Sequence, residues 1–146
     1  MLNFLRIALI AAAAIFAALP ATAGEHHKLA LQISDNDPEK MNAVLNVASN
    51  VSRYYSEKGD EVDIQIVAFN AGFHMLREDT SPVKARLKSF KQGMPNVSFM
   101  ACDVTLRSMA AKEGKEPPLV ANAQHVESGV VTLIELAEKG WTVVRP

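Results

Sequence analysis

The sequence has little of several residue types and lacks the motifs that mark common enzyme classes. Its 146 residues include one cysteine, Cys102, and one tryptophan, and aromatic residues make up only 6% of the chain. It has no phosphate-binding loop, no Cys-x-x-Cys pair and no Gly-x-Ser-x-Gly elbow. Gly-x-Gly-x-x-Gly is missing after the first expected strand, where the chain reads Ser34-Asp35-Asn36-Asp37. These absences disfavour dinucleotide-binding, P-loop, dithiol-redox and serine-hydrolase classes.

No excess of charge of either sign is present. The chain has 15 basic and 16 acidic residues, and its charges are scattered without a polybasic stretch. If residues 1–23 are removed, Arg6 goes with them, which leaves 14 basic against 16 acidic groups. A nucleic-acid partner normally requires a basic face, and anionic membrane surfaces attract polybasic segments. We therefore expect no nucleic-acid partner and no membrane association of the mature chain.

The first 23 residues have the pattern of a secretory signal. Arg6 precedes thirteen apolar residues, which are followed by Pro20 and the small-residue triplet Ala21-Thr22-Ala23. A membrane anchor is the alternative, but thirteen residues fall short of the ~20 that span a bilayer as a helix. We expect cleavage after Ala23 and export, to the periplasm if the source is a Gram-negative bacterium. Residues 24–146 then form one domain.

If the protein is exported, the state of its single cysteine needs an explanation. Disulfides persist outside the cytosol, yet one cysteine cannot form a disulfide within its own chain. Cys102 must therefore be buried and inert, bonded to another molecule, or kept free for chemistry.

Short apolar runs alternate with helical patterns along the mature chain. This alternation predicts a three-layer α/β/α fold with a mostly parallel sheet of four or five strands. The helices are expected to begin at Asp37-Pro38, at Ser81-Pro82, after Cys102 and after Ser128, and the last is expected to bury Val130, Leu133, Ile134 and Ala137. Glycines at 59, 93, 114 and 140 are expected to end them. The expected strands are 29–33, 62–69, 97–102 and 141–144, with a fifth, short one at 119–123.

The second expected strand is more apolar than the others. It becomes continuously hydrophobic through Ile66-Val67-Ala68-Phe69. An exposed edge strand does not usually tolerate so much apolar surface. We therefore expect a homo-oligomer.

Cys102 lies where a strand ends and a helix begins. In open α/β sheets, reactive groups collect at this edge, and the partial positive charge of a helix N-terminus favours a thiolate. Asp103 opposes ionisation by like-charge repulsion and, if it caps the helix, takes up donors that the sulfur would use. The alternative is a buried core thiol, because free cysteine is among the most buried residue types.

Other polar residues are expected at the same edge. Gly72 follows the second strand and lets the backbone approach a ligand closely, and His74 can exchange protons near neutral pH. A loop glycine and a solvent-facing histidine are the simpler interpretation. If His74 and His125 converge on Cys102, the three form a soft site for zinc or copper.

Cleavage after Ala23 also suggests a metal site at the new terminus. A free amine followed by a histidine at the third position, here His26, can hold Cu(II) or Ni(II) in square-planar geometry. The simpler interpretation is an unstructured tail with two histidines.

Three stretches of the sequence resemble one known family. These are Phe99-Met100-Ala101-Cys102 followed by Thr105-Leu106, then Val126-Glu127-Ser128-Gly129-Val130, and the ending Glu138-Lys139-Gly140-Trp141-Thr142-Val143-Val144-Arg145-Pro146. In this order they resemble the DsrE/DsrF-like sulfur-relay family, and in particular its small exported single-domain members. The resemblance implies an α/β domain that assembles into trimers or hexamers. It also implies that Cys102 accepts sulfur as a persulfide and that Thr105 is the matching hydroxyl. Asp103 and Val104 depart from the pattern, which has Gly or Gln and then Asn.

Two functions remain open at this point. The first is an exported sulfur carrier or sulfurtransferase-like protein, without a cofactor, in which Cys102 takes sulfane sulfur from a small-molecule or protein donor and passes it to an acceptor. Its expected pocket residues are Asn70, Gly72, His74, Asp103, Thr105, His125 and Ser128. The second is a non-catalytic oligomeric module that binds a small ligand or redox partner, with Cys102 structural.

Overall fold

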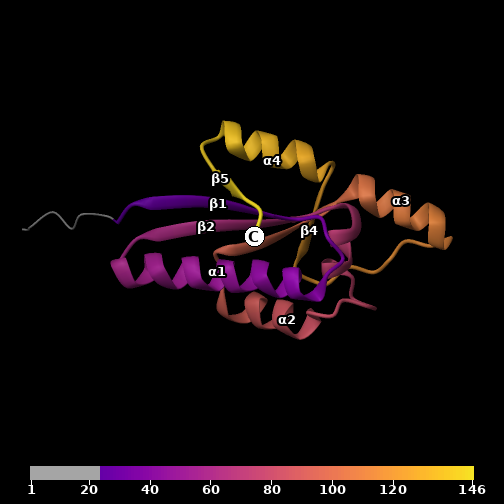
Figure 1. The fold of residues 1–146 in the computed structure, drawn as a ribbon, viewed down its shortest axis with the longest axis horizontal. Coiled ribbons are helices and arrows are strands. Elements are labelled where there is room, and N and C mark those ends of the chain that lie inside the picture. Colours follow the sequence, from indigo (N-terminus) through magenta and orange to yellow (C-terminus); the bar gives the residue numbers. More distant parts are fainter. Residues whose placement is uncertain (1–23) are drawn as a thin grey trace, which may run out of the picture.

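Five parallel strands form one sheet in the order β4-β3-β2-β1-β5 (Figure 1). The computed structural model describes residues 24–146, so the predicted signal segment and its cleavage point lie outside the described residues. The strands are β1 (His26–Ile33), β2 (Glu61–Ala68), β3 (Val97–Cys102), β4 (Ala123–Val126) and β5 (Thr142–Val144). The helices are α1 (Pro38–Lys58), η1 (Asn70–Leu76), α2 (Lys84–Gly93), α3 (Asp103–Glu113) and α4 (Gly129–Glu138). The predicted α/β class with a parallel sheet is confirmed.

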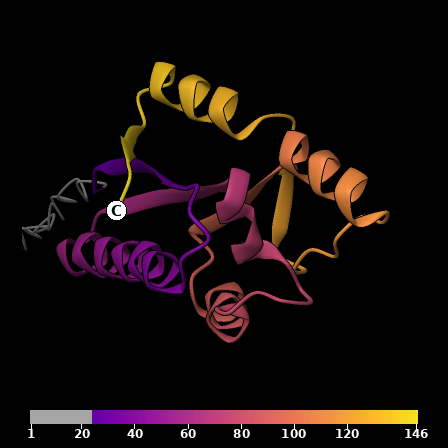
Figure 2. The same cartoon turned by 45° about the vertical axis from the view of Figure 1, so that its right-hand side comes forward.

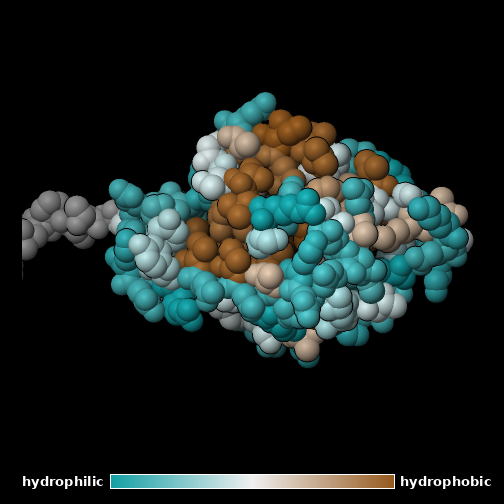
Figure 3. All heavy atoms as spheres, viewed as in Figure 1, coloured by the Kyte–Doolittle hydropathy of each residue, from teal (hydrophilic) through white to brown (hydrophobic). Residues whose placement is uncertain are grey.

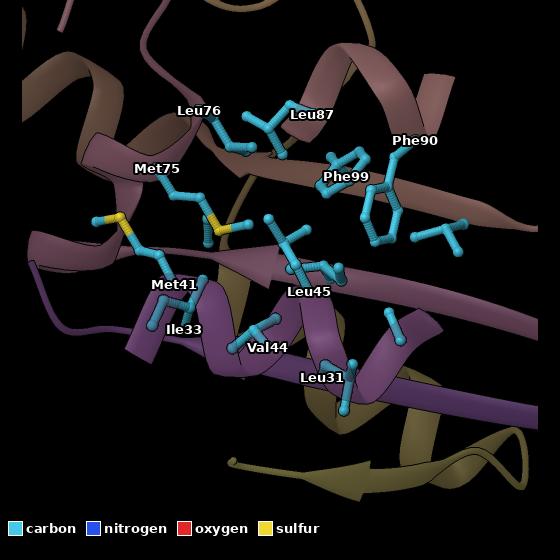
Figure 4. Packing of buried hydrophobic residues seen from close by; sticks show 14 of the residues in the cluster. Leu31, Ile33, Met41, Val44, Leu45, Met75, Leu76, Leu87, Phe90 and Phe99 are labelled. Atoms are coloured by element: carbon cyan, nitrogen blue, oxygen red, sulfur yellow. The ribbon is translucent and has the colours of Figure 1, made fainter. Parts of the chain in front are cut away.

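The helices cover the two faces of the sheet unequally. The larger core lies on the face covered by α1 and α2, where Met41, Leu45, Leu87 and Phe90 pack on the sheet (Figure 4). On the other face α4 packs through Leu133 and Leu136 on a smaller cluster. Figures 1 and 2 show α4 on the opposite side of the sheet from α1 and α2, with α3 beyond one end of the strands.

The change of face follows from chain direction. The chain moves from β1 through β2 and β3 to β4, and then crosses back through α4 to place β5 on the far side of β1. Since crossovers between parallel strands are right-handed, reversing the direction puts the connecting helix on the opposite face. This return brings the start of α4 to the end of β4, next to the end of β3.

Helix ends follow the local signals closely. The Asp37 side chain accepts a hydrogen bond from the Glu39 backbone N–H at 2.8 Å and caps α1, which Gly59 ends in the left-handed conformation. Helix α2 begins at Lys84, later than expected. The reason is that Ser81 stabilises a turn, donating to the Met75 carbonyl and accepting from the Val83 N–H.

Two strand predictions were displaced. The fifth strand is β4 at Ala123–Val126, and not 119–123. Pro117 and Pro118 have no N–H for a ladder, and Ala123 N–H donates to the Val120 carbonyl in a turn. Strand β1 begins at His26, three residues before the predicted start, and pairs with β2 along its whole length.

The apolar stretch of β2 is explained by the position of this strand in the sheet, and not by contact with a partner subunit. β2 lies in the middle of the sheet between β1 and β3. Its residues Ile66, Val67 and Ala68 are fully buried within this one chain. A central parallel strand is covered on both faces, so its apolar residues need no partner subunit. The argument from β2 to a homo-oligomer was therefore wrong, and the homo-oligomer itself stays a prediction.

The buried face of α4 also differs from the prediction. Leu133 is buried as expected, together with Gly129 and Leu136. Val130 and Ile134 are 50% and 54% exposed, and Ala137 is exposed as well. This helix has more apolar residues than the sheet can contact. Periodicity alone therefore could not tell which of them are buried, and the prediction chose the wrong side of the helix.

Within residues 24–146, none of the helices combines the length and the apolar character needed to cross a bilayer.

Gly72 is expected to be essential to the packing of η1 on β1. A Cβ atom at this position would overlap the backbone carbonyl of Ile33 and the following amide nitrogen. Gly72→Ala should lower the free energy of unfolding by about 1–3 kcal/mol, or more, because backbone has to move. Gly93→Ala is the matched control, since its Cβ would meet nothing within 4 Å. It should be neutral or slightly stabilising in the same urea titration; an equal loss in both variants would contradict this account.

Candidate functional site

Cys102 is the last residue of β3 and the N-cap of α3. It lies in register with Val126, the last residue of β4, and the chain then passes through Glu127 and Ser128 into α4. A hydrogen bond of 3.2 Å from the Val104 N–H to the Glu127 carbonyl joins the two strand-to-helix connections. The N-termini of α3 and α4 therefore meet at one cysteine.

The thiol of Cys102 is nearly enclosed and surrounded by hydrogen-bond donors. The residue is 4% exposed. Burial acts to raise the pKa of the thiol, but donors outweigh it: the Gly129 N–H, the Thr105 hydroxyl and N–H, and the Val104 N–H. The net result is a pKa below that of an ordinary thiol. Helix N-termini leave such N–H groups without helical partners, and although the Val104 N–H also donates to the Glu127 carbonyl, a thiolate is a partner that they stabilise well.

Thr105 links the sulfur to the end of β2. Its side chain is one of the few polar groups in the core, with the residue 8% exposed, and its oxygen accepts a 2.9 Å hydrogen bond from the Asn70 N–H. Asn70 directs this N–H from a left-handed backbone conformation, with φ at 49°. Because the Asn70 bond occupies the hydroxyl as an acceptor, the hydroxyl proton is free to point at the Cys102 sulfur.

Asp103 does not take donors away from the sulfur. It stands in the first turn of α3, but its carboxylate is bonded to the His125 ring, with Oδ1 and Nδ1 2.6 Å apart. Cys102 is the N-cap, so the capping role considered for Asp103 was wrong. His125 is therefore a partner of Asp103, lying on β4 next to Ala101.

Three further predicted pocket residues have contacts of their own in the structure. The His74 ring nitrogens bond the side chains of Asn36 and Thr80, and the residue lines a cavity of about 640 Å³ whose lining does not include Cys102. Gly72 faces the backbone of β1, as described above. Ser128 is the N-cap of α4, and its carbonyl accepts from the hydroxyl of Thr132.

The described residues do not bring His74, His125 and Cys102 together as a metal site. Among residues 24–146 there is no group of three His, Cys, Asp or Glu side chains that could hold an ion. His26 belongs to β1, and its Nε2 lies 2.9 Å from Asp63 Oδ2. The Glu25 N–H, which a square-planar copper site would need, donates to Asp60 at 2.9 Å. The interpretation of this stretch as an unstructured tail was wrong.

The donors that sequence reasoning missed are backbone groups. Val104 and Gly129 contribute N–H groups, and neither side chain signals a role. Gly129 also packs tightly, because a Cβ there would lie 3.0 Å from Phe69 Cβ. The available signal was the pair of adjacent strand-to-helix connections, each of which begins a helix with free N–H groups.

Comparison with known proteins supports the fold. No protein-family model and no curated protein matches the sequence. A solved structure, that of the protein of unknown function MTH1491 from Methanobacterium thermoautotrophicum, is similar with a TM-score of 0.70 and 24% sequence identity. The match covers 82% of this chain and 99% of that chain. This likeness establishes the parallel α/β architecture alone.

The Thr105 hydroxyl should lower the pKa of the Cys102 thiol. Thr105→Val removes the donor at constant shape and leaves the Asn70 N–H unpaired, so the pH midpoint of alkylation should rise and stability should fall by about 1–3 kcal/mol. Thr105→Ser keeps the hydroxyl and should keep the midpoint. The measurement is the rate of native alkylation by iodoacetamide against pH. Equal midpoints for the Val and Ser variants would contradict the assigned hydrogen bond.

Proposed function

We propose that this protein is an exported sulfur carrier that accepts sulfane sulfur on Cys102 as a persulfide and passes it to an acceptor. The proposal includes the expected homo-oligomer. The observation that carries it is the position of one nearly buried sulfur between the N-termini of α3 and α4, whose donor groups lower the pKa of the thiol. A cysteine that only fills space needs no such donors, and a neutral thiol uses them poorly because sulfur is a weak acceptor.

Each step of the proposed chemistry is a thiol–disulfide exchange. The Cys102 thiolate attacks the terminal sulfur of a polysulfide, a sulfur–sulfur bond of the donor breaks, and the shortened polysulfide leaves with the electron pair. An acceptor thiolate then attacks the outer sulfur of the Cys102 persulfide. The bond to Cys102 breaks, Cys102 returns as thiolate, and the acceptor carries the persulfide. No external oxidant or reductant is required.

The donor groups assist the release step in particular. A thiol with a lower pKa is a better leaving group in exchange. The N–H groups of Val104, Thr105 and Gly129 stay on the inner sulfur when the outer sulfur departs, and they stabilise the charge that develops there. The Thr105 hydroxyl adds a fourth donor to the same atom.

The small exposed fraction of Cys102 restricts the donor and the acceptor. A residue that is 4% exposed favours slender reagents, such as a linear polysulfide, over bulky ones. In a persulfide the reactive outer sulfur stands about 2 Å beyond the inner one. Loading therefore moves the transferable atom outward while the inner sulfur keeps its hydrogen bonds.

The same burial favours the second candidate, a non-catalytic binding module in which Cys102 is structural. Under that alternative the thiol is a small core residue, and ligands bind elsewhere on the molecule. The two functions differ in whether the folded protein can gain sulfur.

Intact mass under native conditions should distinguish them. The purified protein is measured before and after polysulfide, and then after an alkylating reagent, beside Cys102→Ser. If the protein is a carrier, the wild type gains the mass of one or more sulfur atoms and loses it again when a small thiol is added. The Cys102→Ser variant should show neither change. Ser89→Ala changes an exposed residue of α2 and should load like the wild type.

The opposite result would be a thiol that neither gains sulfur nor reacts with the alkylating reagent until the protein is unfolded. That outcome would assign Cys102 to the core and leave the binding module.

A further inference from the structure

A cavity lies between helix α2 and the stretch of chain that leads into β4. Its volume is about 700 Å³, which is within the range of small-molecule sites in proteins. One wall is α2, and the opposite wall is formed by residues 120–122. This cavity, called here the α2 cavity, is lined neither by Cys102 nor by the residues that donate to its sulfur.

The wall opposite α2 is held in place by hydrogen bonds. The Val120 N–H donates to the Leu76 carbonyl at 3.0 Å. The Asn122 side chain donates to the Leu87 carbonyl at 3.3 Å and so joins this wall to α2. A site whose walls are already formed loses less conformational entropy when a ligand binds.

Three lysines line the α2 cavity from one face of the helix. Lys84, Lys88 and Lys91 follow each other at intervals of four and three residues, so they are neighbours on the helix surface. Glu78 is the one acidic residue of the lining, and its Oε1 lies 3.5 Å from the Lys84 amine. No ion pair among residues 24–146 includes Lys88 or Lys91. These two lysines therefore leave positive charge beside the cavity.

This charge pattern opposes the stability of α2. Like charges three and four residues apart on a helix repel each other. The N-terminus of a helix favours acidic residues, but α2 begins with Lys84 and has no acidic residue in its first turn. A bound anion would relieve both effects, so the pattern favours an anionic ligand.

The rest of the lining is apolar or uncharged. Ala85, Leu87, Val120 and Ala121 line the cavity, and the aliphatic stems of the lysines add to this apolar lining while their amines stay in water. Figure 3 shows mainly hydrophilic residues over α1 and α2, in contrast to the hydrophobic residues gathered over α4 and β5. A purely polar anion would leave the apolar lining uncovered, and a neutral apolar molecule would leave the amines unpaired. The cavity therefore suits a ligand that has both an apolar body and an anionic group.

We propose that the α2 cavity binds a small amphipathic anion, namely an aliphatic chain that carries one carboxylate group. The chain lies beside Leu87 and Val120, and the carboxylate faces the amines of Lys88 and Lys91. Burial of the chain supplies affinity, and the lysines select for negative charge. The proposal goes beyond sulfur transfer and does not depend on it, because the α2 cavity and the Cys102 site share no residue.

Titration with octanoate, followed by two-dimensional NMR of the purified protein, tests this site. Octanoate should shift the amide signals of α2 and of residues 119–122, and the shifts should saturate. 1-Octanol has a similar chain without the charge, and acetate has the charge without the chain, so both should bind more weakly. Added salt should weaken the binding of octanoate, because it screens the exposed lysines.

Variants separate the contributions of charge and cavity. Lys88→Gln and Lys91→Gln should each weaken octanoate binding by about two- to fivefold, which corresponds to one exposed ion pair. Ala85→Leu keeps every lysine but fills part of the cavity, so it should weaken octanoate binding as well. Lys112→Gln is the matched control, because it removes an exposed lysine from α3. It should bind octanoate like the wild type.

Several outcomes would overturn the proposal. One is the absence of saturable shifts, or shifts confined to other parts of the chain. Another is 1-octanol or acetate binding as tightly as octanoate. Unchanged affinity in both lysine variants or in Ala85→Leu would also contradict it, as would an equal loss in Lys112→Gln. The amide spectrum of each variant shows whether it is folded, so a loss of binding is not confused with unfolding.

Discussion

The convergence of two helix N-termini on the sulfur of Cys102 is the interaction on which the functional account depends. Burial acts to raise the pKa of the thiol, and the donor groups of Gly129, Thr105 and Val104 outweigh it and lower that pKa. Neither helix could supply this alone, since α3 begins at the cysteine itself and α4 comes from the neighbouring strand connection. The site is thus a consequence of parallel strands ending side by side.

The remaining fold keeps those two helix starts in place. Gly72 lets η1 contact the end of β1, and Asn70, in its left-handed conformation, fixes the Thr105 oxygen. Asp103 holds His125 on β4 and so ties the start of α3 to the adjacent strand. The return crossover through α4 covers the second face and leaves its own apolar flank beside β5. The position of the site and the exposure of apolar residues on α4 therefore both follow from the return crossover.

The sequence predicted the helices and strands better than it predicted the contacts between them. Local signals such as Asp37, Gly59 and Gly114 placed the ends of α1 and α3 correctly, because caps act within a few residues. The position of Cys102 between β3 and α3 was likewise predicted. What could not be predicted were tertiary relations: that β2 is central, that Val130 and Ile134 face outward, and that His74 bonds Asn36 and Thr80. The backbone N–H groups of Val104 and Gly129 could not be predicted either, because side-chain patterns do not indicate them.

Thiolate absorption in the ultraviolet, followed against pH, tests the central claim most directly. The native protein is compared with the same protein unfolded in urea, and Cys102→Ser supplies the blank for each. The account predicts that the native thiol ionises at a lower pH than the unfolded one, because the donors outweigh burial. A native midpoint equal to or above the unfolded midpoint would show that burial dominates and that the two helix starts do not activate the sulfur.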